Sequence, residues 1–127
     1  MLRVLVVEDE GLISMVASLA LEDAGFHVTV AMDGMEGLQI ARQDKPELII
    51  TDFMMPRMSG LELIRQLRDG GFSGPIILAT SIPESSLPEQ PGHDAYIAKP
   101  YREEQLLAVV ERVVDRSPDG SGDHGPG

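Results

Sequence analysis

The stretch that decides the fold is Leu48-Ile49-Ile50-Thr51-Asp52-Phe53-Met54-Met55-Pro56. An apolar run of strand length ends abruptly at an aspartate, and a proline and Gly60 soon follow. Strands of a parallel sheet are buried on both faces and therefore have continuous apolar sequences. Ligands of such sheets bind outside the carboxyl ends of the strands, so Asp52 is expected where chemistry takes place.

The composition narrows the class of protein. A chain of 127 residues is of single-domain length, and 43% hydrophobic residues favour a globular fold. The net charge of −11 argues against an extended nucleic-acid surface, which needs a basic patch. Without cysteine, disulfides and thiol chemistry are excluded. We find no signal peptide and no apolar run near the roughly 18 residues of a membrane span, so we expect a cytoplasmic protein that binds neither nucleic acid nor membrane.

Strand-like and helical patterns alternate along the chain. Apolar runs predict five short strands, at residues 2–7, 27–31, 48–51, 75–80 and 94–98. The helical period predicts four helices, at about 12–24, 34–43, 60–69 and 102–115. In the first of these we expect an inward face of Ile13, Val16, Ala17, Ala20, Leu21 and Ala24. The alternation predicts a doubly wound α/β fold, a parallel sheet with helices on both faces.

Two segments depart from this alternation. Between Thr80 and Asp94 a helix is expected, but Pro83, Pro88 and Pro91 deny it the backbone hydrogen bonds of a normal helix. We therefore predict a Pro-rich loop with at most a single helical turn. Residues 117–127 contain no apolar side chain and are expected to form a disordered tail after a domain of residues 1–116.

The predicted topology brings polar residues to the carboxyl edge of the sheet. These residues are Glu8, Asp9, Asp52, Thr80 and Lys99. Two like charges 4 Å apart repel by about 4 kcal/mol at an effective dielectric constant near 20, so crowded carboxylates need a proton or a cation. All-oxygen ligands suit Mg²⁺, which usually binds one or two carboxylates and a substrate phosphate. Glu8 and Asp9 could also cap the following helix, which is compatible with metal binding.

Four sequence elements, taken in order, resemble the receiver domain of two-component response regulators. They are Glu8-Asp9, the segment from Asp52 to Gly60, Thr80, and Tyr96-Ile97-Ala98-Lys99-Pro100. The resemblance covers residues 1 to about 116. It implies a flavodoxin-like, five-stranded sheet with strand order 2-1-3-4-5.

The resemblance also implies roles at the acidic edge. Asp52 would be the phosphoacceptor, attacking a phosphohistidine to form an acyl phosphate. Mg²⁺, or Mn²⁺, would bind Asp9, Asp52 and the backbone carbonyl of Met54, with Glu8 acting mostly through water. Such a domain is not an enzyme beyond its own phosphoryl acceptance and dephosphorylation.

Further roles concern the response to phosphorylation. Thr80 would follow the phosphoryl group, Tyr96 would swing inward behind it, and Lys99 would pair with the phosphate. A cis peptide bond before Pro100 would help to place Lys99, while Pro56 and Gly60 would be structural. The partners would be a sensor histidine kinase or a phosphotransfer protein and an unknown downstream protein. The domain itself would be a monomer or a weak, phosphorylation-dependent dimer.

The sequence departs from the family pattern after the fourth strand. Ser81 follows Thr80 where the family usually has alanine or glycine, and the next helix is missing. This region is similar to a single-domain subfamily with a Phe-Ala-Thr-Gly-aromatic signature, although Leu78 and Ser81 replace its phenylalanine and glycine. We predict that residues 82–93 become ordered when phosphate binds, as a population shift.

Three functions are compatible with these residues. The first is a phosphoryl-accepting module without its own output domain, acting as a phosphate shuttle or sink or by docking onto a partner. The second is a pseudo-receiver that binds partners and never takes phosphate. The third is a Mg²⁺-dependent aspartyl phosphatase, which is disfavoured because the haloacid-dehalogenase type has a second aspartate where Met54 stands.

Overall fold

The computed structural model describes residues 2–87 and 92–115, and it is built around a parallel sheet. The five strands are β1 (Arg3–Val7), β2 (His27–Ala31), β3 (Leu48–Asp52), β4 (Ile76–Thr80) and β5 (Ala95–Ala98). All are parallel, and their order is β2-β1-β3-β4-β5. The doubly wound fold and its strand order are therefore confirmed.

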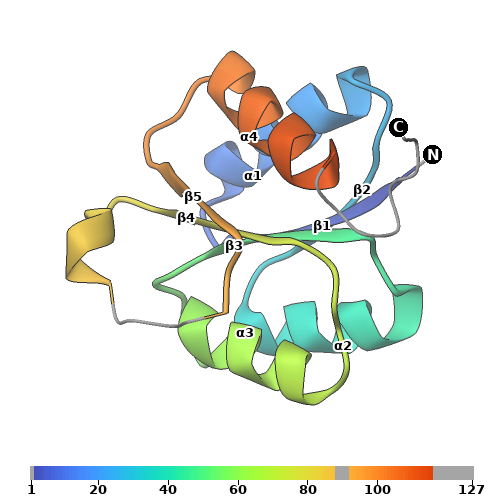
Figure 1. Ribbon diagram of the computed structural model, residues 1–127, viewed down its shortest axis with the longest axis vertical. Coiled ribbons are helices and arrows are strands. Elements are labelled where there is room, and N and C mark those ends of the chain that lie inside the picture. The colour runs from blue at the N-terminus through green and yellow to red at the C-terminus, as the bar shows by residue number, and fades with distance from the viewer. Residues whose placement is uncertain (1, 88–91, 116–127) are drawn as a thin grey trace.

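Helices cover both faces of the sheet. They are α1 (Gly11–Asp23), α2 (Gly34–Asp44), α3 (Gly60–Asp69) and α4 (Glu103–Asp115). In Figure 1, α1 and α4 lie on one face, and α2 and α3 lie on the other. None of these helices is both long and apolar enough to span a bilayer.

The core consists of two layers because successive strand residues point to opposite faces. Val4, Val6 and Ile50 pack on the α1 and α4 side, whereas Leu5 and Ile49 pack on the side of α2 and α3. Strands β3 and β4 are buried along their whole length, as their continuous apolar sequences predict. The sheet is thus a rigid platform whose carboxyl edge carries the polar residues.

The segment after β4 contains only a single turn of 3-10 helix, η1 (Glu84–Ser86). Pro83 precedes this turn, which replaces the helix that the alternation would require. The prediction of a Pro-rich loop or a single turn is confirmed for the described part. Residues 88–91 of the predicted ordering segment, and the tail 117–127, lie outside the described residues.

Two of the helices, α2 and α3, begin with a side-chain cap, and α1 does not. Asp33 accepts a hydrogen bond from the Glu36 backbone at 2.9 Å, and Ser59 accepts one from Glu62 at 3.2 Å. At the start of α1, however, Glu10 holds the N-cap position and makes no side-chain cap bond. Of the two acids that could cap this helix, Glu8 accepts a hydrogen bond from the Glu10 backbone N–H at 3.2 Å, just before the first turn, and its carboxylate also belongs to the acidic group at the sheet edge.

The inward face of α1 is largely the expected one: Ala17, Ala20 and Leu21 are buried, and Ile13 is half-buried. The buried residues are Ser14, Ala17, Ala20 and Leu21, whereas Val16 is 42% exposed and Ala24 lies outside the helix as its C-cap. Apolar residues extend around much of this helix, so periodicity left the limits of the buried face open. Packing places Ser14 inside and Val16 outside.

Candidate functional site

Three carboxylates meet where β1 and β3 end side by side. Val7 is paired with Thr51, so Glu8, which follows β1, falls next to Asp52, the last residue of β3. One carboxylate oxygen from each of Glu8, Asp9 and Asp52 lies within 4.8 Å of the others. Glu8 and Asp52 are buried, whereas Asp9 is accessible to solvent. The expected convergence of the three acids is therefore present.

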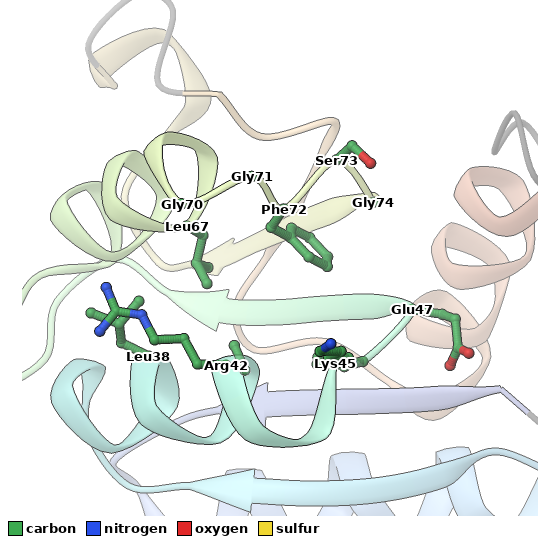
Figure 2. A pocket seen from close by; sticks show the side chains of 12 residues that line it. Leu38, Arg42, Lys45, Glu47, Leu67, Gly70, Gly71, Phe72, Ser73 and Gly74 are labelled. Carbon is green, nitrogen blue, oxygen red and sulfur yellow. The ribbon is translucent and has the colours of Figure 1, made fainter.

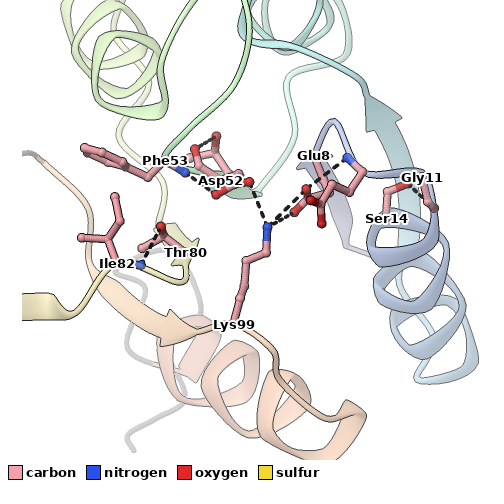
Figure 3. A network of polar contacts seen from close by, with 10 residues as sticks. Glu8, Gly11, Ser14, Asp52, Phe53, Thr80, Ile82 and Lys99 are labelled. Atoms are coloured by element: carbon pink, nitrogen blue, oxygen red, sulfur yellow. Dashed lines mark hydrogen bonds and ion pairs between the residues drawn. The ribbon is translucent and has the colours of Figure 1, made fainter.

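Lys99 reaches this cluster from the end of β5. Its backbone N–H donates to the Thr80 carbonyl at 2.9 Å, which extends the β4–β5 pairing by one residue. The ammonium Nζ lies 2.9 Å from Asp52 Oδ2 and 3.1 and 3.3 Å from the two oxygens of Glu8 (Figure 3). The Lys99–Pro100 peptide bond is cis, the isomer that the resemblance implies.

Burial and the contacts between these groups shift the pKa values of Glu8 and Lys99. Burial raises the pKa of Glu8, and the hydrogen bond from Lys99 only partly opposes this effect. Burial acts to lower the pKa of Lys99, but its hydrogen bonds to Asp52 and Glu8 outweigh that effect and hold the pKa above its ordinary value. When all groups are ionised, one ammonium leaves two of the three carboxylate charges uncompensated. A divalent cation with a preference for oxygen ligands, Mg²⁺ or Mn²⁺, fits this donor set in charge and chemistry.

The loop after Asp52 turns back sharply on the site. Gly60 N–H donates to the Phe53 carbonyl at 2.8 Å, and a Cβ at Gly60 would lie 2.0 Å from the Asp52 carbonyl oxygen. Only glycine allows this approach. The Pro56 carbonyl accepts from Met58 N–H, and Met58 is buried against the α2 and α3 layer, which fixes the far end of the loop. Met54 is 63% exposed, so packing against the core does not explain why a methionine occupies this position in the loop.

Thr80 and Tyr96 are connected through a single residue, Ile82. The Thr80 hydroxyl oxygen accepts from Ile82 N–H at 3.2 Å, and the Tyr96 hydroxyl donates to the Ile82 carbonyl at 2.6 Å. Thr80 is buried at the end of β4, and Figure 3 shows its hydroxyl turned toward Ile82. A change at Thr80 can therefore reach Tyr96 through the backbone of Ile82.

Two residues near the site were missed by the sequence analysis. Arg57 forms an ion pair with Asp33. Its backbone φ is 71°, a value that residues other than glycine rarely adopt. Tyr101 lies near the carboxylates, and burial together with the charge of Glu8 raises its pKa to about 12. Neither residue has a local sequence signal, because each depends on a contact with a distant part of the chain.

Large apolar side chains are exposed around the acidic edge. On α1, Leu12, Met15, Val16 and Leu19 share one face at helical spacing, opposite the buried face, and we call this set the outer face of α1. Met32, Met35 and Met54, from the loops after β2 and β3 and the start of α2, are also exposed. An exposed apolar surface of this kind often marks an interaction site.

Comparison with known proteins finds matches to response regulators. The family model described as response regulator receiver domain matches residues 4–111. The response regulator MprA of Mycolicibacterium vanbaalenii is 36% identical over 126 residues, which are 95% of this chain and 54% of the relative. YkoG of Bacillus subtilis, an uncharacterized transcriptional regulatory protein, is 38% identical over 88% of this chain and 50% of its own length. The chain thus spans about half the length of these curated relatives.

Solved structures are similar over nearly the whole described fold. The chemotaxis response regulator CheY4 of Vibrio cholerae has 33% identity and a TM-score of 0.80, and the match covers 89% of this chain and 98% of CheY4. The response regulator TrrA of Thermotoga maritima, solved in complex with Mg²⁺ and BeF, has 29% identity and a TM-score of 0.81. That match covers 89% of this chain and 99% of TrrA.

Proposed function

Since the chain belongs to the response regulator receiver domain family, we propose that it accepts a phosphoryl group onto Asp52 in a Mg²⁺-dependent phosphorelay. The donor would be the phosphohistidine of a sensor histidine kinase or of a phosphotransfer protein. The observation that carries this proposal is the position of Asp52, buried at the end of β3 beside two other acids with Lys99 bonded to one of its oxygens.

The proposed reaction is an in-line displacement at phosphorus. A carboxylate oxygen of Asp52 forms the new O–P bond, the P–N bond to the donor imidazole breaks, and the imidazole leaves with a proton. Glu8, Asp9, Asp52 and the Met54 carbonyl would hold a Mg²⁺ ion, which supplies charge neutralisation at the phosphoryl oxygens when bound.

Two further groups of the chain are suited to the phosphoryl oxygens. The Lys99 ammonium is already bonded to Asp52, so it would lie beside the phosphoryl group after transfer. The Thr80 hydroxyl uses an oxygen lone pair to accept from Ile82, which leaves its O–H free to donate to a phosphoryl oxygen. Because Tyr96 holds the same residue, Ile82, a displacement of Thr80 would be passed on to the segment around η1.

The outer face of α1 supports a protein donor. This helix begins at the acidic edge and presents four apolar side chains along its length, beside the place where a partner that delivers a phosphoryl group to Asp52 must bind. A partner surface with apolar side chains would bury this face while its histidine reaches the carboxylates. The acid-rich chain favours a donor with basic residues around that apolar contact.

The role of the phosphorylated domain is part of the proposal. We propose that it acts as a phosphate shuttle or sink or by docking onto a downstream protein. Its own catalysis would be limited to phosphoryl acceptance and dephosphorylation. The cytoplasmic location and the monomeric or weakly dimeric state expected from the sequence stay predictions.

The experiment that tests the proposal is intact mass after incubation with acetyl phosphate. It is run with and without Mg²⁺, beside Asp52→Asn. We expect one phosphate adduct that requires both Mg²⁺ and Asp52.

If no adduct forms, a beryllofluoride titration separates two explanations. Binding indicates fast hydrolysis of the acyl phosphate, whereas the absence of binding favours the pseudo-receiver. Continuous turnover of a phosphomonoester would instead favour a phosphatase.

A further inference from the structure

A cavity lies at the edge of the sheet opposite to the carboxylates. It is formed by the C-terminal halves of α2 and α3 and by residues 70–74, which connect α3 to β4 (Figure 2). Glu47, which immediately precedes β3, lines the cavity, whereas Asp52 ends the same strand. The volume of about 740 Å³ is within the range that holds small organic ligands, about 300–1,000 Å³.

The inner wall of this cavity is apolar. Leu38, Ala41 and Leu67 are buried core residues that line it, and the half-buried ring of Phe72 adds an aromatic surface. Arg68 stacks on Phe72 at 5.6 Å, but its guanidinium donates to the carbonyls of Phe72 and Gly74 and is not available to a ligand. An occupant therefore needs an apolar body.

Two cations border this apolar wall, Arg42 and Lys45. Within residues 2–87 and 92–115 neither side chain has a hydrogen bond or an ion pair, and both residues are exposed. The other basic side chains described there, apart from Arg112, bind a carboxylate or a carbonyl; they are Arg3, Arg57, Arg65, Arg68, Lys99 and Arg102. In a chain with a net charge of −11, two cations without an ion pair among the described residues make the rim of this cavity locally positive.

The acid at the cavity, Glu47, does not neutralise these cations. Its carboxylate accepts a hydrogen bond from the Arg3 backbone N–H at 2.6 Å. Figure 2 shows Glu47 at the far end of the cavity, with its carboxylate turned away from Arg42 and Lys45.

Lys45 also has an unusual backbone. It has φ 51° and ψ 63°, the left-handed conformation usual for glycine at a helix end, and proline follows it. This conformation costs a lysine about 1–2 kcal/mol. A positive charge near a helix C-terminus stabilises the helix by only about 0.3–1 kcal/mol at an exposed site. The helix end alone therefore does not explain a lysine here, whereas a ligand that uses its ammonium would.

We propose that this cavity binds an organic carboxylate with an apolar body, with the body on Leu67 and Phe72 and the carboxylate attracted to the positive rim that Arg42 and Lys45 form. The site is separate from Asp52 and does not depend on the phosphoryl transfer proposed above.

The test is a titration of the ¹⁵N-labelled full chain with 4-phenylbutyrate, followed by amide chemical shifts. We expect saturable shifts centred on Gly70, Gly71 and Ser73. The neutral analogue 4-phenylbutanamide should bind about tenfold more weakly. Asp52→Asn should bind the carboxylate like the unmodified chain, which separates this site from the receiver site.

Two variants test the cations. Arg42→Gln and Lys45→Gly should each weaken binding about fivefold, and Lys45→Gly should fold at least as well because glycine accepts the left-handed backbone. Arg112→Gln, at an exposed arginine on α4 that has no hydrogen bond or ion pair among the described residues, should leave binding unchanged. The proposal is overturned if the shifts centre on the outer face of α1, if the amide binds as well as the carboxylate, or if both cavity variants bind normally.

Discussion

At the scale of single residues, Lys99 governs the charge balance of the site. Its ammonium binds oxygens of both buried acids, Glu8 and Asp52, and its own side chain is only 11% exposed. The same two carboxylates belong to the group that could hold a Mg²⁺ ion. Lysine and metal are therefore expected to stabilise the acids in similar ways and to compete for them.

Replacing this lysine tests that balance. We predict that Lys99→Met lowers the free energy of unfolding of the metal-free protein by about 3 kcal/mol, because two buried carboxylates lose their partner. Mg²⁺ should bind about tenfold more tightly and restore most of the loss, because a repelling positive charge is gone. Urea unfolding with EDTA and with Mg²⁺ measures both effects, and Arg112→Met is the control. Equal Mg²⁺ affinities in Lys99→Met and the unmodified chain would contradict the competition.

The raised pKa of Glu8 predicts a pH dependence of stability. The folded protein binds this proton more tightly than the unfolded chain, so the stabilisation is complete below the ordinary value of 4.5 and is lost as the pH rises through the raised pKa. Asp33 and Glu62 have lowered pKa values, so their contribution is lost only as the pH falls below their ordinary values of 3.8 and 4.5. The two pH ranges do not overlap.

Glu8→Gln isolates the contribution of Glu8. In EDTA, the unfolding free energy of the unmodified chain should decline relative to that of Glu8→Gln as the pH rises above 4.5, because only the former must ionise a buried acid. Urea titrations between pH 4.5 and 8 measure this difference. If the difference stays constant over this range, the burial of Glu8 has no energetic consequence.

At the scale of elements, Arg68 on α3 fixes the connections at the amino edge of the sheet. Its guanidinium donates to the carbonyls of Phe72, Gly74 and Gly92 and to the carboxylate of Asp94. Asp94 in turn accepts from the Ile76 backbone, so α3, β4 and the start of β5 meet at one side chain.

We predict that Arg68→Ala lowers the free energy of unfolding by about 2 kcal/mol, because several carbonyls lose a charged donor. The control is Arg65→Ala on the same helix, where an exposed ion pair with Glu62 contributes less than about 1 kcal/mol. Urea unfolding of both variants provides the comparison. Equal losses would show that Arg68 acts as an ordinary surface residue.

The two faces of α1 should also behave differently. Leu12→Gln and Leu19→Gln should change the unfolding free energy by less than about 0.5 kcal/mol, because both side chains are exposed. Leu21→Ala should cost about 2–5 kcal/mol, because Leu21 is fully buried.

The same exposed variants test the partner surface. Phosphorylation of Leu12→Gln and Leu19→Gln by acetyl phosphate should be unchanged, whereas transfer from a protein donor should slow about tenfold. A protein donor that phosphorylates both variants at the normal rate would rule out the outer face of α1 as its docking surface.

At the scale of the whole molecule, the domain is completed by α4. The residues of both core layers lie between Val4 and Val114. We therefore predict that a chain ending at residue 116 has the same thermal midpoint, within about 1 °C, and the same Mg²⁺ affinity as the full chain. Calorimetry of the two chains checks this, with Leu106→Ala as a destabilised reference. A lower midpoint for the shortened chain would place the domain boundary later.

Much of the fold and of the site could be predicted from the sequence. The apolar runs that end at Val7, Asp52 and Thr80 specify buried parallel strands, and parallel strands carry their C-terminal residues to one edge. The prolines after Thr80 likewise predicted the loss of a helix, because the obstacle is local to the backbone. Most of the buried face of α1 was predicted, but its limits were not: only packing places Ser14 inside and Val16 outside, because apolar residues extend around much of that helix.

The sequence by itself determined which residues meet at the carboxyl edge, because alternating strands and helices form a parallel sheet, and parallel strands all end at one edge. The order of the strands was implied by the resemblance to receiver domains, not by local patterns. Only the tertiary structure decided how their charges are arranged: Lys99 between Glu8 and Asp52, Arg57 on Asp33, and Tyr96 joined to Thr80 through Ile82. It also decided that Arg42 and Lys45 border an apolar cavity. The physical reason is that hydrogen bonds and ion pairs form between side chains that lie far apart in sequence, and their partners are fixed only when the layers pack.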